Sequence, residues 1–233
     1  MGYLYFIEGI MQRYFLENNE FSKDDLHHIL NVMRFKSSDQ VEICMQDGCY
    51  LSTLKIEQKN VSFEIIEKLK EHKSRDIMII QGLPKGDKME IVTKYATLFG
   101  ATSIYFMPMK RSIAKLSNED HKLNRFIKIS KEAAELSKRQ RIPHIDFIKS
   151  VKELNTEGYV MFLLDEEEKN YTLDQAIQAY PNEKVLCIIG PEGGIDGTER
   201  KMFLDMGVIP LSLGNYIFPT ELAHIPFLNA FSL

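Results

Sequence analysis

The residues with the most distinctive chemistry lie in a short stretch, IIGPEGGIDGTE, which runs from Ile188 to Glu199. A strongly apolar segment stops here at Gly190-Pro191, and a glutamate and two adjacent glycines follow it. Because glycine has no Cβ, the backbone at Gly193 and Gly194 can approach a ligand closely or adopt a positive φ. The pattern predicts either a ligand-binding loop or a tight turn between a buried strand and a helix.

The composition of this loop narrows the kind of ligand that it could hold. Glu192 would repel a phosphate group, and no Lys-Ser or Lys-Thr pair follows the glycines as it does in a P-loop. No G-x-G-x-x-G motif opens the first strand-to-helix unit, which argues against an ordinary dinucleotide-dependent oxidoreductase. Glu192 and Glu221 are each interpreted either as an acid or base, or as a brace that accepts hydrogen bonds from backbone N–H groups.

A second loop of the same kind follows about twenty residues later. An apolar strand is predicted over residues 208–213, and it ends at Gly214-Asn215. Backbone N–H and C=O groups of the two loops could bind the edge of an adenine, while Leu213, Ile217 and Phe218 cover its face. The two loops therefore predict a pocket for a neutral nucleoside cofactor rather than for a triphosphate.

Such loops need a sheet that brings the strand ends together. From residue 77 onward, short apolar segments alternate with helical patterns. This alternation predicts an α/β fold with a mostly parallel sheet and helices on both faces. In such sheets ligands bind beyond the carboxyl ends of the strands, which is where residues 190–194 fall. The predicted strands are residues 77–80, 104–107, 159–164, 185–189 and 208–213, and the helices include residues 87–99 and 119–140.

The helix after the first loop has recognisable start and stop signals. Asp196 is the predicted N-cap, Glu199 has the spacing of a capping box, and Gly207 ends the helix. Four consecutive acids at residues 165–168 follow another predicted strand and are interpreted as a solvated loop.

The first part of the chain has a different pattern, with strands predicted at residues 41–45, 50–56 and 61–66. Asp47-Gly48 predicts a hairpin turn between the first two strands. Ser22, with Asp25 three residues later, predicts the start of a preceding helix. The charged stretch 68–76 is the predicted linker, so two domains are expected, at residues 1–70 and 74–233.

Composition limits the class of protein. The 233 residues are 44% hydrophobic and 27% charged, the formal net charge is -4, and no run of about eighteen apolar residues predicts a membrane span. Cys44, Cys49 and Cys187 lack metal-ligand spacing and are predicted to be reduced thiols in a cytoplasmic protein. His27 and His28 have no carboxylate or cysteine partners at ligand spacing, so no metal site is predicted.

Positive charge is concentrated in residues 122–141, which contain seven lysines or arginines and two glutamates. This segment predicts either a basic strip that faces RNA or the solvated face of a helix. Arg13 and Arg34 have the same two interpretations, a phosphate contact or a structural role. The strip would consist of Lys128, Lys131, Lys138, Arg139 and Arg141.

Several motifs in a fixed order give the chain a resemblance to a known family. GPEGG at residues 190–194 is followed by L-G-x-x-I-x-x-T-E at residues 213–221. Earlier motifs are HILNVMR at 28–34, KGDKME at 85–90 and EAAELSKRQRIP at 132–143. Together, and over the whole chain, these resemble the RsmE family of the SPOUT superfamily.

The resemblance implies a fold, an activity and partners. The activity would be methylation of N3 of a uridine in 16S ribosomal RNA, with S-adenosyl-L-methionine as cofactor. Residues 74–233 would form a SPOUT methyltransferase domain with a C-terminal trefoil knot, and residues 1–70 a PUA-like β-barrel that helps to hold RNA. The protein would be a homodimer that acts on 16S rRNA or the small ribosomal subunit, without a metal or a membrane.

The resemblance also implies the site residues. It favours an RNA contact for Arg139 and Arg141 at the end of the predicted long helix, and for Lys138 beside them. The implied cofactor-binding residues are Leu163, Leu164, Gly190, Pro191, Glu192, Gly193, Gly194, Leu211, Ser212, Leu213, Gly214, Ile217, Phe218 and Thr220.

The chain departs from the family pattern in its last motif. Tyr216 and Pro219 stand where the family has arginines, and Pro226 is expected to kink or break the final helix. Uridine N3 carries a proton and is a poor nucleophile, so a catalyst must remove that proton or stabilise negative charge on the ring. The candidates for this task are Arg111, Arg139 and Glu221, and Arg141 is a further source of positive charge. The alternative is an impaired or non-catalytic RNA-binding or ribosome-assembly protein on the same scaffold.

Overall fold

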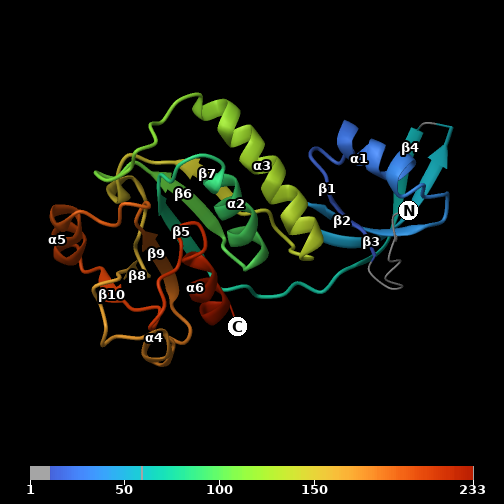
Figure 1. Cartoon of the computed structure of the whole chain (residues 1–233). Helices are drawn as coiled ribbons and strands as arrows, with labels where there is room; N and C mark the ends of the chain where they lie inside the picture. Colours follow the sequence, from blue (N-terminus) through green and yellow to red (C-terminus); the bar gives the residue numbers. More distant parts are fainter. Residues whose placement is uncertain (1–10, 59, 233) are drawn as a thin grey trace. The chain divides into compact units, whose positions relative to one another are not determined.

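The computed structural model describes residues 11–58 and 60–232, which divide into two compact units (Figure 1). The first unit runs to His72 and also includes Ala134–Arg141, and the second comprises Lys73–Ala133 and the chain from Ile142 onward. Within the described residues, no helix combines the length and the apolar character needed to cross a membrane.

The second unit is built on a six-stranded sheet in the order β10-β8-β9-β5-β6-β7, in which all neighbours are parallel. This confirms the predicted α/β class with a mostly parallel sheet. β10 is shorter than predicted, and the Pro210 at its centre, which has no N–H to donate, lies in an edge strand of the sheet. The strands are β5 (Ile77–Gly82), β6 (Ser103–Met107), β7 (His144–Phe147), β8 (Tyr159–Leu164), β9 (Lys184–Ile189) and β10 (Ile209–Leu211).

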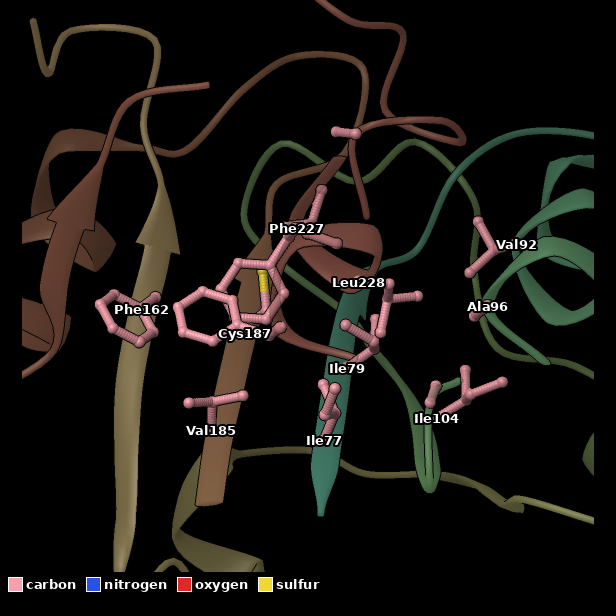
Figure 2. Packing of buried hydrophobic residues seen from close by; sticks show 14 of the residues in the cluster. Ile77, Ile79, Val92, Ala96, Ile104, Phe162, Val185, Cys187, Phe227 and Leu228 are labelled. Atoms are coloured by element: carbon pink, nitrogen blue, oxygen red, sulfur yellow. The ribbon is translucent and has the colours of Figure 1, made fainter. Parts of the chain in front are cut away.

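Helices cover both faces of this sheet. Ile77 and Ile79 of β5 pack on one face with Val92 and Phe227 (Figure 2). Ile80 packs on the other face, in the same cluster as Phe203. Alternate side chains of one strand thus enter two cores, as a strand buried on both faces requires. The helices are α2 (Lys88–Leu98), α3 (Glu119–Leu136), α4 (Leu173–Ala179), α5 (Gly197–Asp205) and α6 (His224–Phe231), with a short 3-10 helix at Val151–Glu153.

The ends of α5 and α6 test three predictions. The Asp196 side chain caps α5 by accepting from the Thr198 N–H, and Gly207 follows the helix with φ +81°, as predicted. The predicted capping box is wrong, because Glu199 accepts instead from the Lys110 N–H at 2.8 Å. The expected break at Pro226 is also wrong: α6 begins at His224, so the proline lies in the first turn, where backbone N–H groups have no helical partner.

The first unit contains a four-stranded sheet in the order β1-β2-β3-β4. β1 is parallel to β2, and the other pairs are antiparallel. The predicted hairpin is confirmed, with Asp47 between its two strands, and Ser22 and Asp25 form a capping box at the start of α1. The elements are β1 (Arg13–Phe15), α1 (Lys23–His27), a π-helix (His28–Val32), β2 (Gln40–Met45), β3 (Gly48–Glu57) and β4 (Asn60–Lys68).

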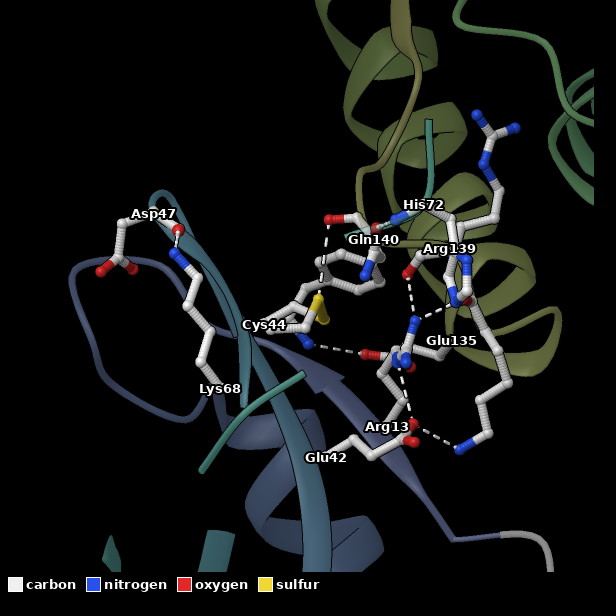
Figure 3. The surroundings of a disulfide bond; sticks show 12 residues. Arg13, Glu42, Cys44, Asp47, Lys68, His72, Glu135, Arg139 and Gln140 are labelled. Atoms are coloured by element: carbon white, nitrogen blue, oxygen red, sulfur yellow. Dashed lines mark hydrogen bonds and ion pairs between the residues drawn. A yellow bond between two sulfur atoms is a disulfide. The ribbon is translucent and has the colours of Figure 1, made fainter. Parts of the chain in front are cut away.

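The cysteines differ from expectation. Cys44 and Cys49 are joined by a disulfide, so the prediction of reduced thiols is wrong for this pair (Figure 3). The physical reason is the hairpin, whose register places the two residues directly opposite each other on β2 and β3. Cys187 is free and buried in the core of the second unit, and burial raises the pKa of its thiol.

Candidate functional site

The carboxyl ends of β8, β9 and β10 meet at one edge of the sheet. Leu164 is paired with Ile189 on one side and with Leu211 on the other, so the loops after the three strands start side by side. These loops surround a cavity of about 810 Å³, which lies within the range of small-molecule sites. The cavity is formed entirely by residues of the second unit.

Most residues implied as cofactor-binding line this cavity. Leu163 does not, because its side chain points to the opposite face of β8 and is fully buried in the second core cluster. Arg111 also lines the cavity. The implied residues that do line it are Leu164, Gly190, Pro191, Glu192, Gly193, Gly194, Leu211, Ser212, Leu213, Gly214, Ile217, Phe218 and Thr220.

The glycines of the first loop are required by close packing and by backbone conformation. A Cβ on Gly190 would lie 2.7 Å from Ile195 Cγ1, and a Cβ on Gly193 would lie 3.0 Å from Arg111 Cβ. Gly194 has a backbone φ of +72°, a conformation that residues other than glycine rarely adopt. The loop is therefore compact, and the Arg111 side chain is packed along it.

A buried amide fixes the base of both loops. Gln81, at the end of β5, is fully buried, and its Nε2 donates to Thr220 Oγ1 at 2.7 Å and to the Gly190 carbonyl at 3.3 Å. Thr220 Oγ1 donates in turn to the Gly190 carbonyl at 2.5 Å. Sequence reasoning missed Gln81. Its signal was a single polar residue in the otherwise apolar strand IMIIQG, since buried polar groups need partners.

A lysine connects the outer parts of the same loops. Lys88, in the first turn of α2, places its Nζ 3.2 Å from Glu192 Oε1 and 3.0 Å from Glu221 Oε2. Glu192 Oε1 also accepts from the Lys85 N–H at 2.9 Å. Glu221 and Glu192 raise the pKa of Lys88. Burial acts to raise the pKa of Glu192, but the hydrogen bonds from Lys85 and Lys88 outweigh it and leave that pKa below its usual value.

The acidic run at residues 165–168 lines the cavity, rather than forming only a solvated loop. Asp165 is 9% exposed, and its Oδ2 accepts from Arg200 Nε at 2.6 Å. Glu168 accepts from the N–H groups of Asn170 and Tyr171, which lowers its pKa. The carboxylates therefore give this wall of the cavity a negative character, partly balanced by Arg200.

The candidate catalytic residues lie in different places. Arg111 is exposed beside the first loop, and its guanidinium donates to the Gly193 carbonyl at 3.0 Å. Glu221 is half-buried, pairs with the Lys88 side chain and is not among the residues that line the cavity, and its catalytic role stays a prediction. Arg139 belongs to the first unit, and burial lowers its pKa to about 10. The catalytic role of Arg139 stays a prediction.

The RNA contacts implied by the resemblance and the two arginines of the first strand and loop belong to the first unit, whereas Lys128 and Lys131 of the predicted strip belong to the second. Arg13 is 6% exposed, and its guanidinium donates to Glu42 at 2.9 Å and to the Arg139 carbonyl at 2.7 Å (Figure 3). This burial favours the structural interpretation of Arg13. Lys138 Nζ also contacts Glu42, at 2.7 Å. Arg34 and Arg141 are exposed, and Arg141 pairs with Glu71 at 3.2 Å.

Comparison with known proteins assigns the chain to a family. Residues 70–232 match the model of an RNA methyltransferase domain. Over 95% of its length, the chain is 31% identical to ribosomal RNA small subunit methyltransferase E of Bacillus subtilis, 96% of which is covered. The chain is a member of this methyltransferase E family. Its resemblance to the RsmE family is thereby confirmed.

Other members of the methyltransferase E family agree with this assignment. The protein of that name from Mesomycoplasma hyopneumoniae is 29% identical, with 96% of each chain covered. The crystal structure of the Neisseria gonorrhoeae protein of that name, bound to S-adenosyl methionine, superposes with a TM-score of 0.81 over 95% of this chain and 96% of the other. At 21% identity, that similarity concerns the fold.

Metal ligands were not predicted. In the part of the chain that the structure describes, no group of three or more His, Cys, Asp or Glu side chains is arranged to hold a metal ion.

Proposed function

We propose that this protein is an S-adenosylmethionine-dependent methyltransferase that modifies N3 of a uridine in 16S ribosomal RNA. The observation that carries the proposal is the cavity at the ends of β8, β9 and β10, formed by the two glycine loops and the acidic segment between them in space. Membership of the methyltransferase E family supports the same activity.

The residues of the cavity fit this cofactor. Leu213, Ile217 and Phe218 offer apolar surface for an adenine face, and the backbone of residues 190–194 and 211–214 offers N–H and C=O groups for its edge. The carboxylates of Glu166 and Glu192 line the same cavity and suit a cofactor that carries positive charge and ribose hydroxyls. They would repel a triphosphate.

The chemical task left to the protein concerns the uracil ring. When bound, S-adenosylmethionine supplies an electrophilic methyl group on a sulfonium centre. The protein must hold the uridine in line with that group and stabilise the negative charge that develops as N3 loses its proton. Arg111 is suited to this task, because its exposed guanidinium is anchored on the Gly193 carbonyl and keeps further N–H donors free for a base.

The finer parts of the proposal concern the architecture. We propose that residues 74–233 carry the trefoil knot of SPOUT methyltransferases and that residues 1–70 form a PUA-like barrel. RNA phosphate would be bound on the first unit by the exposed Arg34 and Arg141, together with Lys138 and Arg139. We also propose a cytoplasmic homodimer that acts on 16S rRNA or the small ribosomal subunit.

A single-turnover methylation assay tests the function. Purified protein is mixed with S-adenosylmethionine and either 16S rRNA or small subunits that lack the modification, and 3-methyluridine is quantified by mass spectrometry. Appearance of 3-methyluridine with either substrate is expected. Cofactor binding without transfer to either substrate would contradict the proposal and support the non-catalytic alternative. Tyr216 and Pro219, which replace two arginines of the family pattern, are the sequence features that favour that alternative.

The proposed role of Arg111 is tested in the same assay. Arg111→Gln is expected to slow methyl transfer by about a hundredfold, because one donor to a developing anion is lost. The affinity for cofactor should change little, and Arg111→Lys should recover part of the rate. An unchanged rate in Arg111→Gln would exclude the role.

A further inference from the structure

One side chain joins three separate segments at the rim of the cavity. Lys88 belongs to the first turn of α2, Glu192 to the loop after β9, and Glu221 to the loop before α6. The Nζ of Lys88 lies 3.2 Å from the first carboxylate and 3.0 Å from the second. A single ammonium thus bridges the two loops that line the cavity.

The bridge is most shielded from water at Glu221. The side chains of Lys88, Glu192 and Glu221 are 31%, 27% and 16% exposed, so each is partly removed from water. Charge interactions strengthen as solvent is excluded. The start of α2 is also fixed to the first loop, because the Lys85 N–H donates to the same Glu192 oxygen that faces Lys88.

The bridge complements the buried contact at the base of the loops. Gln81 and Thr220 join the two loops on the inside, through the Gly190 carbonyl. On the outside, Glu192 and Glu221 both approach the same Lys88 nitrogen, so without that charge two carboxylates would face each other. Like charges at such separations repel, and the loops would move apart.

We propose that Lys88 is a positioning residue that holds the two cavity loops together and thereby sets the affinity of the site for S-adenosylmethionine. This inference rests on the proposed function, and it assigns to Lys88 no contact with the reacting atoms. It explains why the two glutamates are placed in different loops and yet approach one nitrogen.

Titration calorimetry with S-adenosylmethionine tests the proposal. Lys88→Met is expected to weaken binding by about tenfold, and in the methylation assay to raise the KM for the cofactor more than it lowers kcat. Lys88→Arg should restore most of the affinity, because a guanidinium also reaches two carboxylates. The matched control is Lys94→Met, an exposed lysine on the same helix, which should bind cofactor normally.

A double substitution separates electrostatics from general loss of packing. Lys88→Met combined with Glu221→Gln removes the repulsion and should bind cofactor several-fold more tightly than Lys88→Met alone. Affinity of Lys88→Met equal to that of the unsubstituted protein would overturn the inference, as would an equally weak double variant in a folded state shown by circular dichroism. If the unsubstituted protein does not bind S-adenosylmethionine, the proposed function fails instead, so the two failures are distinguishable.

Discussion

At the scale of single residues, the conformation of the loop at residues 190–194 depends on a backbone φ that favours glycine. Gly194 has φ +72°, whereas Gly197, three residues later, begins α5 without a positive φ and has open space around its Cα. Both positions have room for an added methyl group, so they differ mainly in φ. Comparing them therefore isolates the cost of the backbone conformation.

Gly194→Ala should lower the free energy of unfolding by about 1 kcal/mol or more, because an L-residue is strained at this φ. A Cβ at Gly194 would lie 3.5 Å from Glu166 Oε1, so crowding adds little. Urea denaturation measures the change. Gly197→Ala is the control and should leave stability unchanged within about 0.5 kcal/mol. Equal effects of the two substitutions would contradict the conformational argument.

Thr220 tests the inner contact between the loops. Thr220→Val keeps the shape of the side chain but removes the hydroxyl that accepts from Gln81 and donates to the Gly190 carbonyl. The expected loss is about 1 kcal/mol in the free energy of unfolding, because the buried Gln81 amide loses one of its acceptors and keeps the Gly82 and Gly190 carbonyls. Thr220→Ser keeps the hydroxyl and should retain most of the stability. Thermal unfolding of the three proteins compares them, and equal losses in both variants would assign the effect to packing.

At the scale of elements, α6 begins with a histidine that is buried among apolar residues. His224 is fully buried at its first position, and neither ring nitrogen has a hydrogen-bond partner among the described residues. Burial lowers the pKa of His224 to about 4. The folded state therefore holds a neutral imidazole at a pH where an unfolded chain binds a proton.

This difference predicts how stability depends on pH. Between about pH 6.5 and pH 4 the unfolded state binds more protons at this position, so the free energy of unfolding falls as the pH falls, by about 1.4 kcal/mol per pH unit at most. His224→Phe should remove this part of the slope and stay folded at pH 7. Urea titrations at pH 7 and pH 5 measure it. The idea fails if both proteins lose the same stability between these values.

The sequence allowed much of the element pattern to be predicted. β9 is an apolar run that ends at Gly-Pro, and Ser22 and Asp196 cap helices as their types and positions suggest. The errors came from tertiary context. Cys44 and Cys49 meet only through the hairpin register, and Pro226 is tolerated only because α6 starts two residues before it.

The candidate site was predicted in its loops but not in its connections. The glycines and apolar residues of the cavity wall can be recognised in the sequence from their residue type alone. Gln81 and Lys88 act through partners more than 100 positions away in the chain, as their contacts with Gly190, Glu192 and Thr220 show. Such pairings depend on the strand order, in which β5 lies beside β9. No local pattern encodes that order.

At the scale of the whole molecule, the cavity belongs to one unit. Binding of S-adenosylmethionine should therefore slow hydrogen exchange in the loops at residues 190–196 and 211–220 and leave the first unit unaffected. At a cofactor concentration of about 100 times Kd, the added stability is about 2.7 kcal/mol. Exchange monitored by mass spectrometry measures the protection. ATP is the control, because the acidic wall should exclude it, and equal protection by ATP would contradict the assignment of the cavity.

The position of β9 in the sheet also has a consequence for synthesis of the chain. β9 separates β8 from β5, although it is translated long after β5. A nascent polypeptide therefore leaves the ribosome with one hydrogen-bonding edge of β5 uncovered until Lys184–Ile189 has emerged. Exposed edges of this kind pair with other chains. Fragments that end before residue 184 should therefore aggregate, and chaperones should bind the growing chain during that interval.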